Sequence, residues 1–152
     1  MNSMPPIADL DLRRASLCQL LHWLATGRVQ PRVLADVYQQ AIERLDPELH
    51  DYVDHRSGLL QDQADLADRR RRDGVIGRLD GIPLAVKDNF DIAGWPTRVG
   101  LPGRGKPVQE DAHVVARLRA SGARLVGKTN MDEGALGATT DNPHFGATHN
   151  PY

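Results

Sequence analysis

A lysine follows a short apolar run in the middle of this sequence. The run extends from Ile82 to Val86, and Lys87, Asp88 and Asn89 come directly after it. A run of this length, bounded by turn signals, is typical of a fully buried strand in a parallel sheet. An ammonium taken out of water loses solvation and becomes a neutral base more readily. Lys87 is therefore a candidate base at the carboxyl end of a strand, where open α/β sheets bind ligands. A solvated lysine, or one paired with Asp88, explains the same residue without catalysis.

A second lysine lies in a segment that matches a phosphate-binding motif. Residues 122–129 satisfy the pattern G-x-x-x-x-G-K-[ST], with Lys128 in the lysine position. A phosphate-binding loop needs a strand before the first glycine and a helix after the lysine. Here a helical pattern precedes Gly122, and the four residues between the glycines are themselves the predicted strand. We therefore predict a strand at this position and no nucleotide site.

Two other clusters have simpler interpretations than ligand binding. His50 and His55 are five residues apart with carboxylates between them, a spacing that matches no metal-ligand motif, and we predict no metal site. The run 69–72 consists of four arginines, which could hold phosphate or RNA. A solvated helix C-terminus explains the run better, because it is short and no aromatic residue interrupts it.

Composition narrows the class of protein. The 152 residues carry 19 Lys and Arg against 20 Asp and Glu, so the net charge of −1 gives no electrostatic reason to expect nucleic acid. Cys18 is the only cysteine, which excludes an intrachain disulfide and suits a reducing compartment. No apolar run approaches a membrane span, and the first residues lack the pattern of a signal peptide. We expect one domain in a cytoplasmic protein.

Periodicity predicts helices first and an α/β unit after them. Apolar spacing predicts a helix from Ser16 to about Gly27, a second from Pro31 to Asp46, and a third from Ser57 to about Arg72. Pro47 is expected to end the second helix, and a short strand is expected at Tyr52-Val53.

The second half predicts two parallel strands joined by a helix. Asp111 can cap a helix that stops at Gly122, and the strand 124–128 follows. A strand, a crossover helix and a strand form a βαβ unit with a right-handed crossover. The Gly- and Pro-rich segment 90–107 is expected to be a loop above the strand end, and a short helix is expected near 131–136.

Three blocks of this sequence resemble the amidase signature family. They are Gly81-Ile-Pro-Leu-Ala-Val-Lys-Asp-Asn89, Gly127-Lys-Thr-Asn-Met-Asp-Glu133 and the tail with Asp141-Asn-Pro-His-Phe-Gly146 and Asn150-Pro151. The resemblance is strong over 74–152 and looser before it. It implies an α/β fold with a mixed sheet, in which 1–152 is the N-terminal part of a single amidase domain. Residues 1–73 would be its mostly helical layer and 74–152 the start of the α/β core.

The resemblance also implies a serine hydrolase that needs no cofactor. Lys87 would be the catalytic lysine of a Ser–cis-Ser–Lys triad that hydrolyses a small carboxamide to acid and ammonia through an acyl-enzyme. In the family both serines lie in a Gly/Ser-rich segment downstream of the Asn-Pro pair. After Lys87 this chain has only Ser121, at the end of the crossover helix. We therefore expect the chain alone to be inactive.

The resemblance implies a substrate pocket as well. Met131 to Ala138 would line the acyl pocket, and the site residues expected there are Met131, Gly134, Ala135, Leu136 and Gly137. Asp88, Asn89 and Asn130 would support the site from behind. The small residues could leave room for a bulky acyl group, or could simply permit close backbone packing.

The expected partner is a small-molecule amide, without nucleic acid or membrane. Asn-Met-Asp-Glu also resembles the amidase-type chain of the glutamyl-tRNA amidotransferase, which needs partner subunits, whereas the tail resembles stand-alone amidases, which we favour. A non-catalytic α/β piece is the remaining alternative. Because a truncated parallel sheet leaves unpaired edges, we expect a homo-oligomer or pairing with the missing C-terminal portion.

Overall fold

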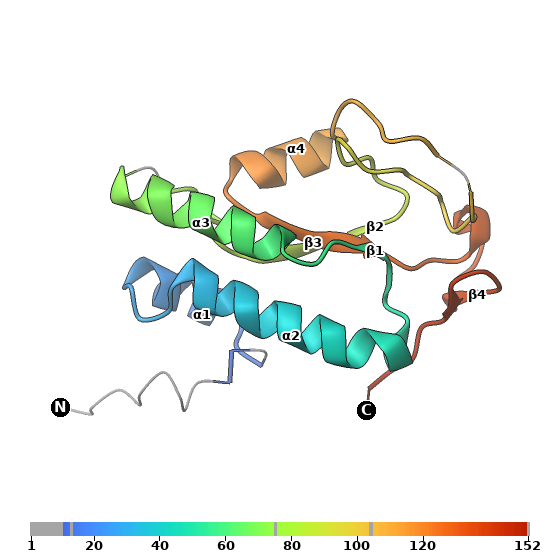
Figure 1. Cartoon of the computed structure of the whole chain (residues 1–152), viewed down its shortest axis with the longest axis horizontal. Helices are drawn as coiled ribbons and strands as arrows, with labels where there is room; N and C mark the ends of the chain where they lie inside the picture. The colour runs from blue at the N-terminus through green and yellow to red at the C-terminus, as the bar shows by residue number, and fades with distance from the viewer. Residues whose placement is uncertain (1–10, 13, 75, 104, 152) are drawn as a thin grey trace.

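The computed structural model describes residues 11–12, 14–74, 76–103 and 105–151. Helices dominate the first half, and the strands that carry the candidate site lie mostly in the second half (Figure 1). In chain order the elements are α1 (Leu17–Ala25), α2 (Pro31–Leu49), β1 (Tyr52–His55), α3 (Leu59–Arg72), β2 (Pro83–Lys87), α4 (His113–Ala120), β3 (Arg124–Thr129), the 3₁₀ turn η2 (Glu133–Ala135), β4 (Asp141–Asn142) and β5 (Gly146–Ala147).

The main sheet is mixed and has β3 in its centre. Its strand order is β1-β3-β2, with β2 parallel and β1 antiparallel to β3. The parallel pair with α4 between its strands confirms the predicted βαβ unit. Gly127 allows β1 to approach closely, since a Cβ there would meet the Asp54 carbonyl oxygen at 2.6 Å. β4 and β5 form a separate small hairpin.

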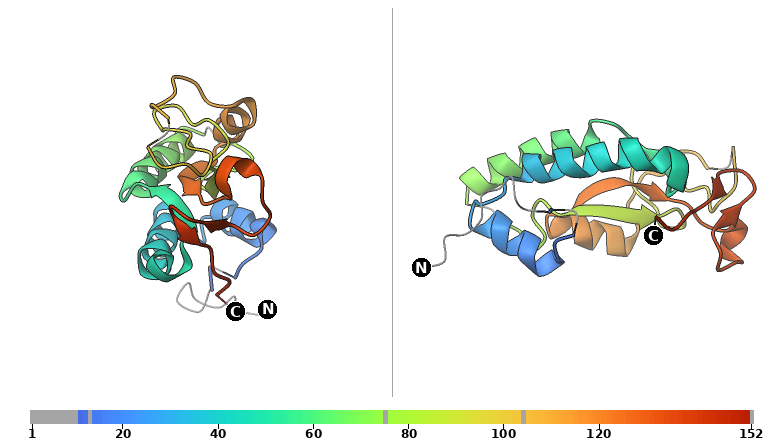
Figure 2. Two further views of the ribbon diagram at one scale, coloured as in Figure 1. Left: turned by 90° about the vertical axis from the view of Figure 1, so that its right-hand side faces the viewer. Right: turned by 90° about the horizontal axis from the view of Figure 1, so that it is seen from below.

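Helices cover both faces of this sheet, as Figures 1 and 2 show. Successive residues of β3 point to opposite faces. Leu125 packs with Val115 of α4 and with Ile92 and Trp95 of the long loop. Val126 packs on the other face against α2 and α3. β3 is therefore the buried axis of the fold, as its apolar sequence indicates.

A glutamine side chain takes the place of a strand along part of β3. β1 pairs only with Gly127–Thr129, which leaves the edge of β3 at Leu125 without a strand. Gln63 of α3 accepts a hydrogen bond from the Leu125 N–H at 2.9 Å and donates one to the Leu125 carbonyl at 3.0 Å. The amide thus satisfies both backbone groups of a residue that would otherwise lack partners.

The second helix runs further than its proline predicts. α2 passes Pro47 and ends at Leu49, so the expected stop at Asp46-Pro47 is wrong. Pro47 lies in the last turn, where its missing N–H removes a single helical hydrogen bond. His50 then closes the helix in the left-handed conformation, and its N–H donates to the Asp46 carbonyl at 2.8 Å.

Of the three predicted side-chain caps, one is confirmed. Ser16 and Gln19 form a reciprocal capping box at the start of α1. Ser57 does not cap α3, because its hydroxyl bonds to Glu43 while Gly58 occupies the cap position. Asp111 does not cap α4, because its carboxylate accepts from the Ala93 N–H at 2.8 Å and binds an arginine of the same helix. Tertiary partners outcompete the local cap at both sites.

None of the helices in the described part of the chain has the length and apolarity needed to cross a membrane.

Candidate active site

Lys87 is the last residue of β2 and lies beside the end of β3. Its register partner is Thr129, so the lysine stands at the carboxyl edge of two parallel strands, as predicted. The prediction of a fully buried strand is wrong, because Ala85 and Lys87 are exposed while Val86 is buried. β2 is the outer strand of this sheet, and alternate side chains of an outer strand point to a face that the described residues leave open.

Asp88 faces the interior, and its carboxylate binds Lys128 rather than the neighbouring Lys87. The side chains of Asp88 and Lys128 are both 0% exposed, and the Lys128 Nζ lies 3.1 Å from the Asp88 Oδ1. The Asp88 N–H donates to the Thr129 carbonyl at 3.2 Å, which continues the ladder one residue beyond β2. This leaves the Lys87 side chain on the open face without an ion pair to Asp88.

Lys128 lies on β3, which confirms that the motif around it is not a phosphate-binding loop. Its structural importance was not predicted from the sequence. A lysine inside an apolar run is itself a signal, because a lysine is almost never fully buried unless it is paired. The partner could not be identified from the sequence, since Asp88 is forty residues away.

The expected pocket residues follow directly from β3. Met131 is buried, with 1% of its surface exposed, and belongs to the interior. Gly134, Ala135, Leu136 and Gly137 are exposed around the turn η2, and Leu136 is 93% exposed. The structure therefore brings this loop to the strand edge that carries Lys87, with one large apolar side chain reaching into solvent.

Asp132 holds the loop 131–140 in shape. Its carboxylate accepts hydrogen bonds from the N–H groups of Thr140 at 3.0 Å and Thr139 at 3.1 Å, and from the Thr139 hydroxyl at 3.0 Å. The bond from the Thr140 backbone is the largest cause that lowers the pKa of Asp132 below its ordinary value, because it stabilises the ionised carboxylate.

Two buried asparagines join the loops behind the site. Asn130 donates through Nδ2 to the carbonyl of Gly146 at 2.9 Å, which supports its predicted position behind the strand edge. Asn142 was not singled out from the sequence, yet its Nδ2 donates to the carbonyls of Gly100 and Met131 at 2.9 and 2.8 Å. Asn89, the third expected support residue, is exposed.

Ser121 lies at the opposite end of the sheet from Lys87. It follows α4 and comes shortly before Arg124, the first residue of β3, whereas Lys87 pairs with Thr129, the last one. Five residues of strand separate these ends, which corresponds to about 16 Å. Ser121 is therefore too distant to exchange a proton with Lys87.

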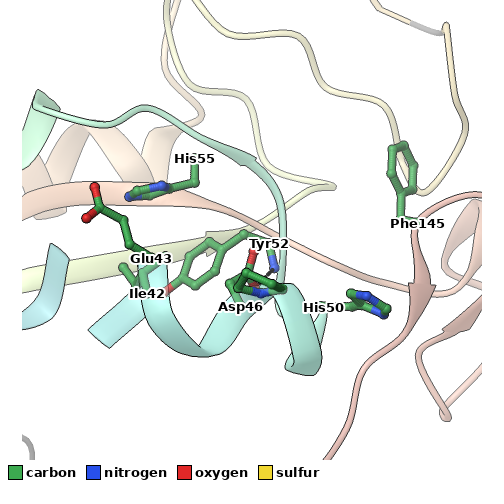
Figure 3. A pocket seen from close by; sticks show the side chains of 8 residues that line it. Ile42, Glu43, Asp46, His50, Tyr52, His55 and Phe145 are labelled. Carbon is green, nitrogen blue, oxygen red and sulfur yellow. Dashed lines mark hydrogen bonds between the residues drawn. The ribbon is translucent and has the colours of Figure 1, made fainter. Parts of the chain in front are cut away.

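The histidines at positions 50 and 55 border a separate hollow of about 310 Å³ between α2, β1 and Phe145. Figure 3 shows the imidazoles of His50 and His55 on opposite sides of Tyr52, with His55 directed toward Glu43. Burial, followed by Asp51 and Asp46, raises the pKa of the Tyr52 phenol to about 12. In the part of the chain that the structure describes, no three metal-binding side chains converge.

Comparison with known proteins decides the family. The family model described as Amidase matches residues 34–152. The chain belongs to the amidase family. The mixed α/β architecture also matches solved amidases: the peptide amidase of Stenotrophomonas maltophilia superposes with a TM-score of 0.82 at 32% identity, over 93% of this chain and 31% of that one. A bacterial aryl acylamidase of the amidase signature family gives a TM-score of 0.80 at 25% identity, over 90% of this chain and 29% of its own.

Curated relatives include proteins named as amidases and one component of an amidotransferase. The protein AmiB2 of Mycobacterium tuberculosis, which is named as an amidase, is 40% identical over 142 residues, covering 93% of this chain and 31% of the relative. One of the subunits of the glutamyl-tRNA(Gln) amidotransferase of Methylobacillus flagellatus is 39% identical, covering 90% of this chain and 28% of the relative. The chain thus spans less than a third of the length of these relatives.

Proposed function

We propose that residues 1–152 supply the catalytic lysine and part of the acyl pocket of an amidase that hydrolyses a small carboxamide to acid and ammonia. The observation that carries the proposal is the position of Lys87. It ends β2 on the open face of the sheet, beside the strand that continues into Met131–Gly137. In a member of the amidase family, this lysine occupies the motif that resembles the catalytic block of the amidase signature.

The proposed mechanism assigns Lys87 the role of final proton acceptor. A nucleophilic serine attacks the amide carbonyl while a second serine, held as a cis peptide, takes its proton and passes it to the Lys87 amine. The proton then goes to the departing nitrogen, ammonia leaves, and water hydrolyses the acyl-enzyme. Both serines belong outside residues 1–152 in this proposal, so the 152-residue chain alone is inactive.

The exposure of Lys87 fits this division of the active site. A base must be neutral before it can accept a proton. An ammonium in contact with water is well solvated, and covering it with protein favours the neutral amine. The segment that brings the serines to this face would therefore also exclude water from Lys87.

A component of a tRNA-dependent amidotransferase is the second candidate. It is favoured by the similarity to the Methylobacillus flagellatus protein, and it would use the same amide hydrolysis with glutamine as the substrate. The two candidates differ in their partners. A stand-alone amidase turns over small amides by itself, whereas an amidotransferase component of this kind requires its companion chains.

The test is ammonia release by the full gene product that contains residues 1–152. Short aliphatic amides, aryl amides and glutamine are offered in turn, with wild type compared to Lys87→Ala. Lys106→Ala is the matched control, because Lys106 is the other exposed lysine and lies in the loop 90–107. We expect hydrolysis that Lys87→Ala abolishes and Lys106→Ala leaves intact. Equal activity of wild type and Lys87→Ala would refute the assignment.

A further inference from the structure

The interior beneath the strand ends holds a charged pair that the proposed chemistry does not use. Lys128 and Asp88 are both fully buried and 3.1 Å apart. Removing two charges from water costs several kcal/mol per ion, and their attraction offsets that cost only when the remaining polar groups also find partners. A pair that meets this condition fixes one arrangement of the chain around it.

The Lys128 ammonium has an acceptor for each of its protons. Besides Asp88, its Nζ donates to the Phe90 carbonyl at 2.8 Å and to the Thr97 hydroxyl at 3.0 Å, and the Pro96 carbonyl lies at 3.4 Å. These acceptors come from both ends of the loop 90–97. One side chain of β3 therefore closes this loop against the end of β2.

Asp88 in turn receives three successive backbone N–H groups. Arg98 and Gly100 donate to its carboxylate at 3.4 and 3.5 Å, and Val99 donates to its carbonyl at 3.2 Å. Gly100 has no room for a side chain, since a Cβ would lie 2.9 Å from the Asp132 carbonyl oxygen. The loop thus wraps around Asp88 and touches the start of the expected pocket.

Val99 carries backbone strain at this point. Its φ is +55°, a left-handed conformation that is a genuine outlier for a β-branched residue and costs about 1–2 kcal/mol. Such strain persists where surrounding contacts hold it in place, and it is concentrated at functional sites. The Val99 carbonyl accepts the Gly134 N–H at 2.9 Å, so the strained residue connects Asp88 to the loop 131–137.

We propose that Lys128 and Asp88 are positioning residues for Lys87 and for the pocket loop. This inference rests on the proposed function, because it assigns the pair to the same site. Lys87 is bonded directly to Asp88 through the chain, and Gly134 is connected to Asp88 through Val99. A shift of Asp88 therefore displaces both sides of the site, and a misplacement of about 1 Å costs about 100-fold in rate.

The experiment compares buried ion pairs at the two ends of the sheet in the full gene product. Lys128→Met removes the ammonium, Thr97→Val removes one of its acceptors with little change of shape, and Lys128→Met with Asp88→Asn removes both charges. Arg71→Met is the matched control, because the Arg71 Nε lies 2.9 Å from the equally buried Asp80. The measurements are kcat and KM for amide hydrolysis, the urea midpoint, and hydrogen exchange of peptides that contain Val99 and Gly134.

We expect Lys128→Met to lower kcat about 100-fold with a smaller change in KM, and to speed exchange at Val99 and Gly134. Thr97→Val gives a smaller fall in the same direction and keeps the test valid if Lys128→Met does not fold. The double variant recovers part of the lost kcat, because no buried charge is left unpaired. Arg71→Met loses stability but keeps its kcat and its exchange at Gly134.

Two results would overturn the proposal. One is a kcat that stays at the wild-type value in both Thr97→Val and Lys128→Met, with stability lost as in Arg71→Met. The other is unchanged exchange at Gly134 in both variants. The exchange measurement needs no substrate, so it tests the positioning even if the wild type hydrolyses no amide, which would refute the proposed function itself.

Discussion

The substitution Gln63→Glu tests whether a side chain replaces a strand at the edge of β3. The Gln63 Nε2 donates to the carbonyls of Leu125 at 3.0 Å and Leu59 at 3.1 Å, while its oxygen accepts the Leu125 N–H. A carboxylate keeps the shape and the accepted bond. It loses both donated bonds and turns an oxygen toward two carbonyl oxygens.

The expected loss of stability follows from these two donated bonds. A hydrogen bond contributes about 0.5–1.5 kcal/mol net, so two lost bonds amount to about 2 kcal/mol, and the repulsion between oxygens raises the total toward about 3 kcal/mol. Domains are stable by only about 5–15 kcal/mol, so the change is readily measured. Protonating the introduced carboxyl restores one donor, and the loss should shrink near pH 4.

The assay is urea unfolding of the purified protein at pH 7 and near pH 4. Gln40→Glu on the exposed face of α2 is the control, because it makes the same chemical change where no backbone depends on it. Surface substitutions of this kind usually stay within about 0.5 kcal/mol. The interpretation is wrong if the two variants unfold at the same urea concentration at pH 7.

Three further measurements address other parts of the structure. With a limiting acetylating reagent, Lys87 and Lys106 of the 152-residue chain should react while Lys128 is protected until unfolding; mass spectrometry showing equal labelling of Lys128 and Lys106 would contradict its burial. The lowered pKa of Asp132 means that the folded loop binds its proton more weakly than the unfolded chain, so the stabilisation is present above the ordinary value of 3.8 and is lost as pH falls through the lower, folded value. Exchange of the Thr140 amide followed against pH should show this loosening below pH 3.8, and in Asp132→Asn the amide should exchange faster at all pH values. The pKa of Tyr52 is raised to about 12, so stability that is complete below the ordinary value of 10 should decline between pH 10 and 12, with a late absorbance change that Tyr52→Phe removes.

The local features of this fold could be predicted from the sequence because neighbours in the chain determine them. The apolar runs before Lys87 and Lys128 indicated the two parallel strands, and Ser16 marked the start of α1. The resemblance to amidases indicated the position of the candidate site. Each of these rests on a pattern shorter than a single helix or strand.

What could not be predicted depends on partners that are distant in the chain. Gln63 and Leu125 are 62 residues apart, and nothing in a polar helix position indicates that its amide will complete a sheet. The burial of Lys128 required Asp88, and the exposure of Lys87 depends on which strands flank β2. The failed cap at Asp111 has the same cause, since its carboxylate is used by the Ala93 N–H of the long loop.

The complete burial of Lys128 and Asp88 also constrains how the chain folds. Neither charge can enter the interior alone, because an unpaired buried ion destabilises a protein by about 3–5 kcal/mol. The loop that holds the acceptors of Lys128 must therefore close in the same cooperative step in which β3 docks beside β2. Intermediates with a docked β3 and an open loop are disfavoured, so this end of the sheet forms as a single unit.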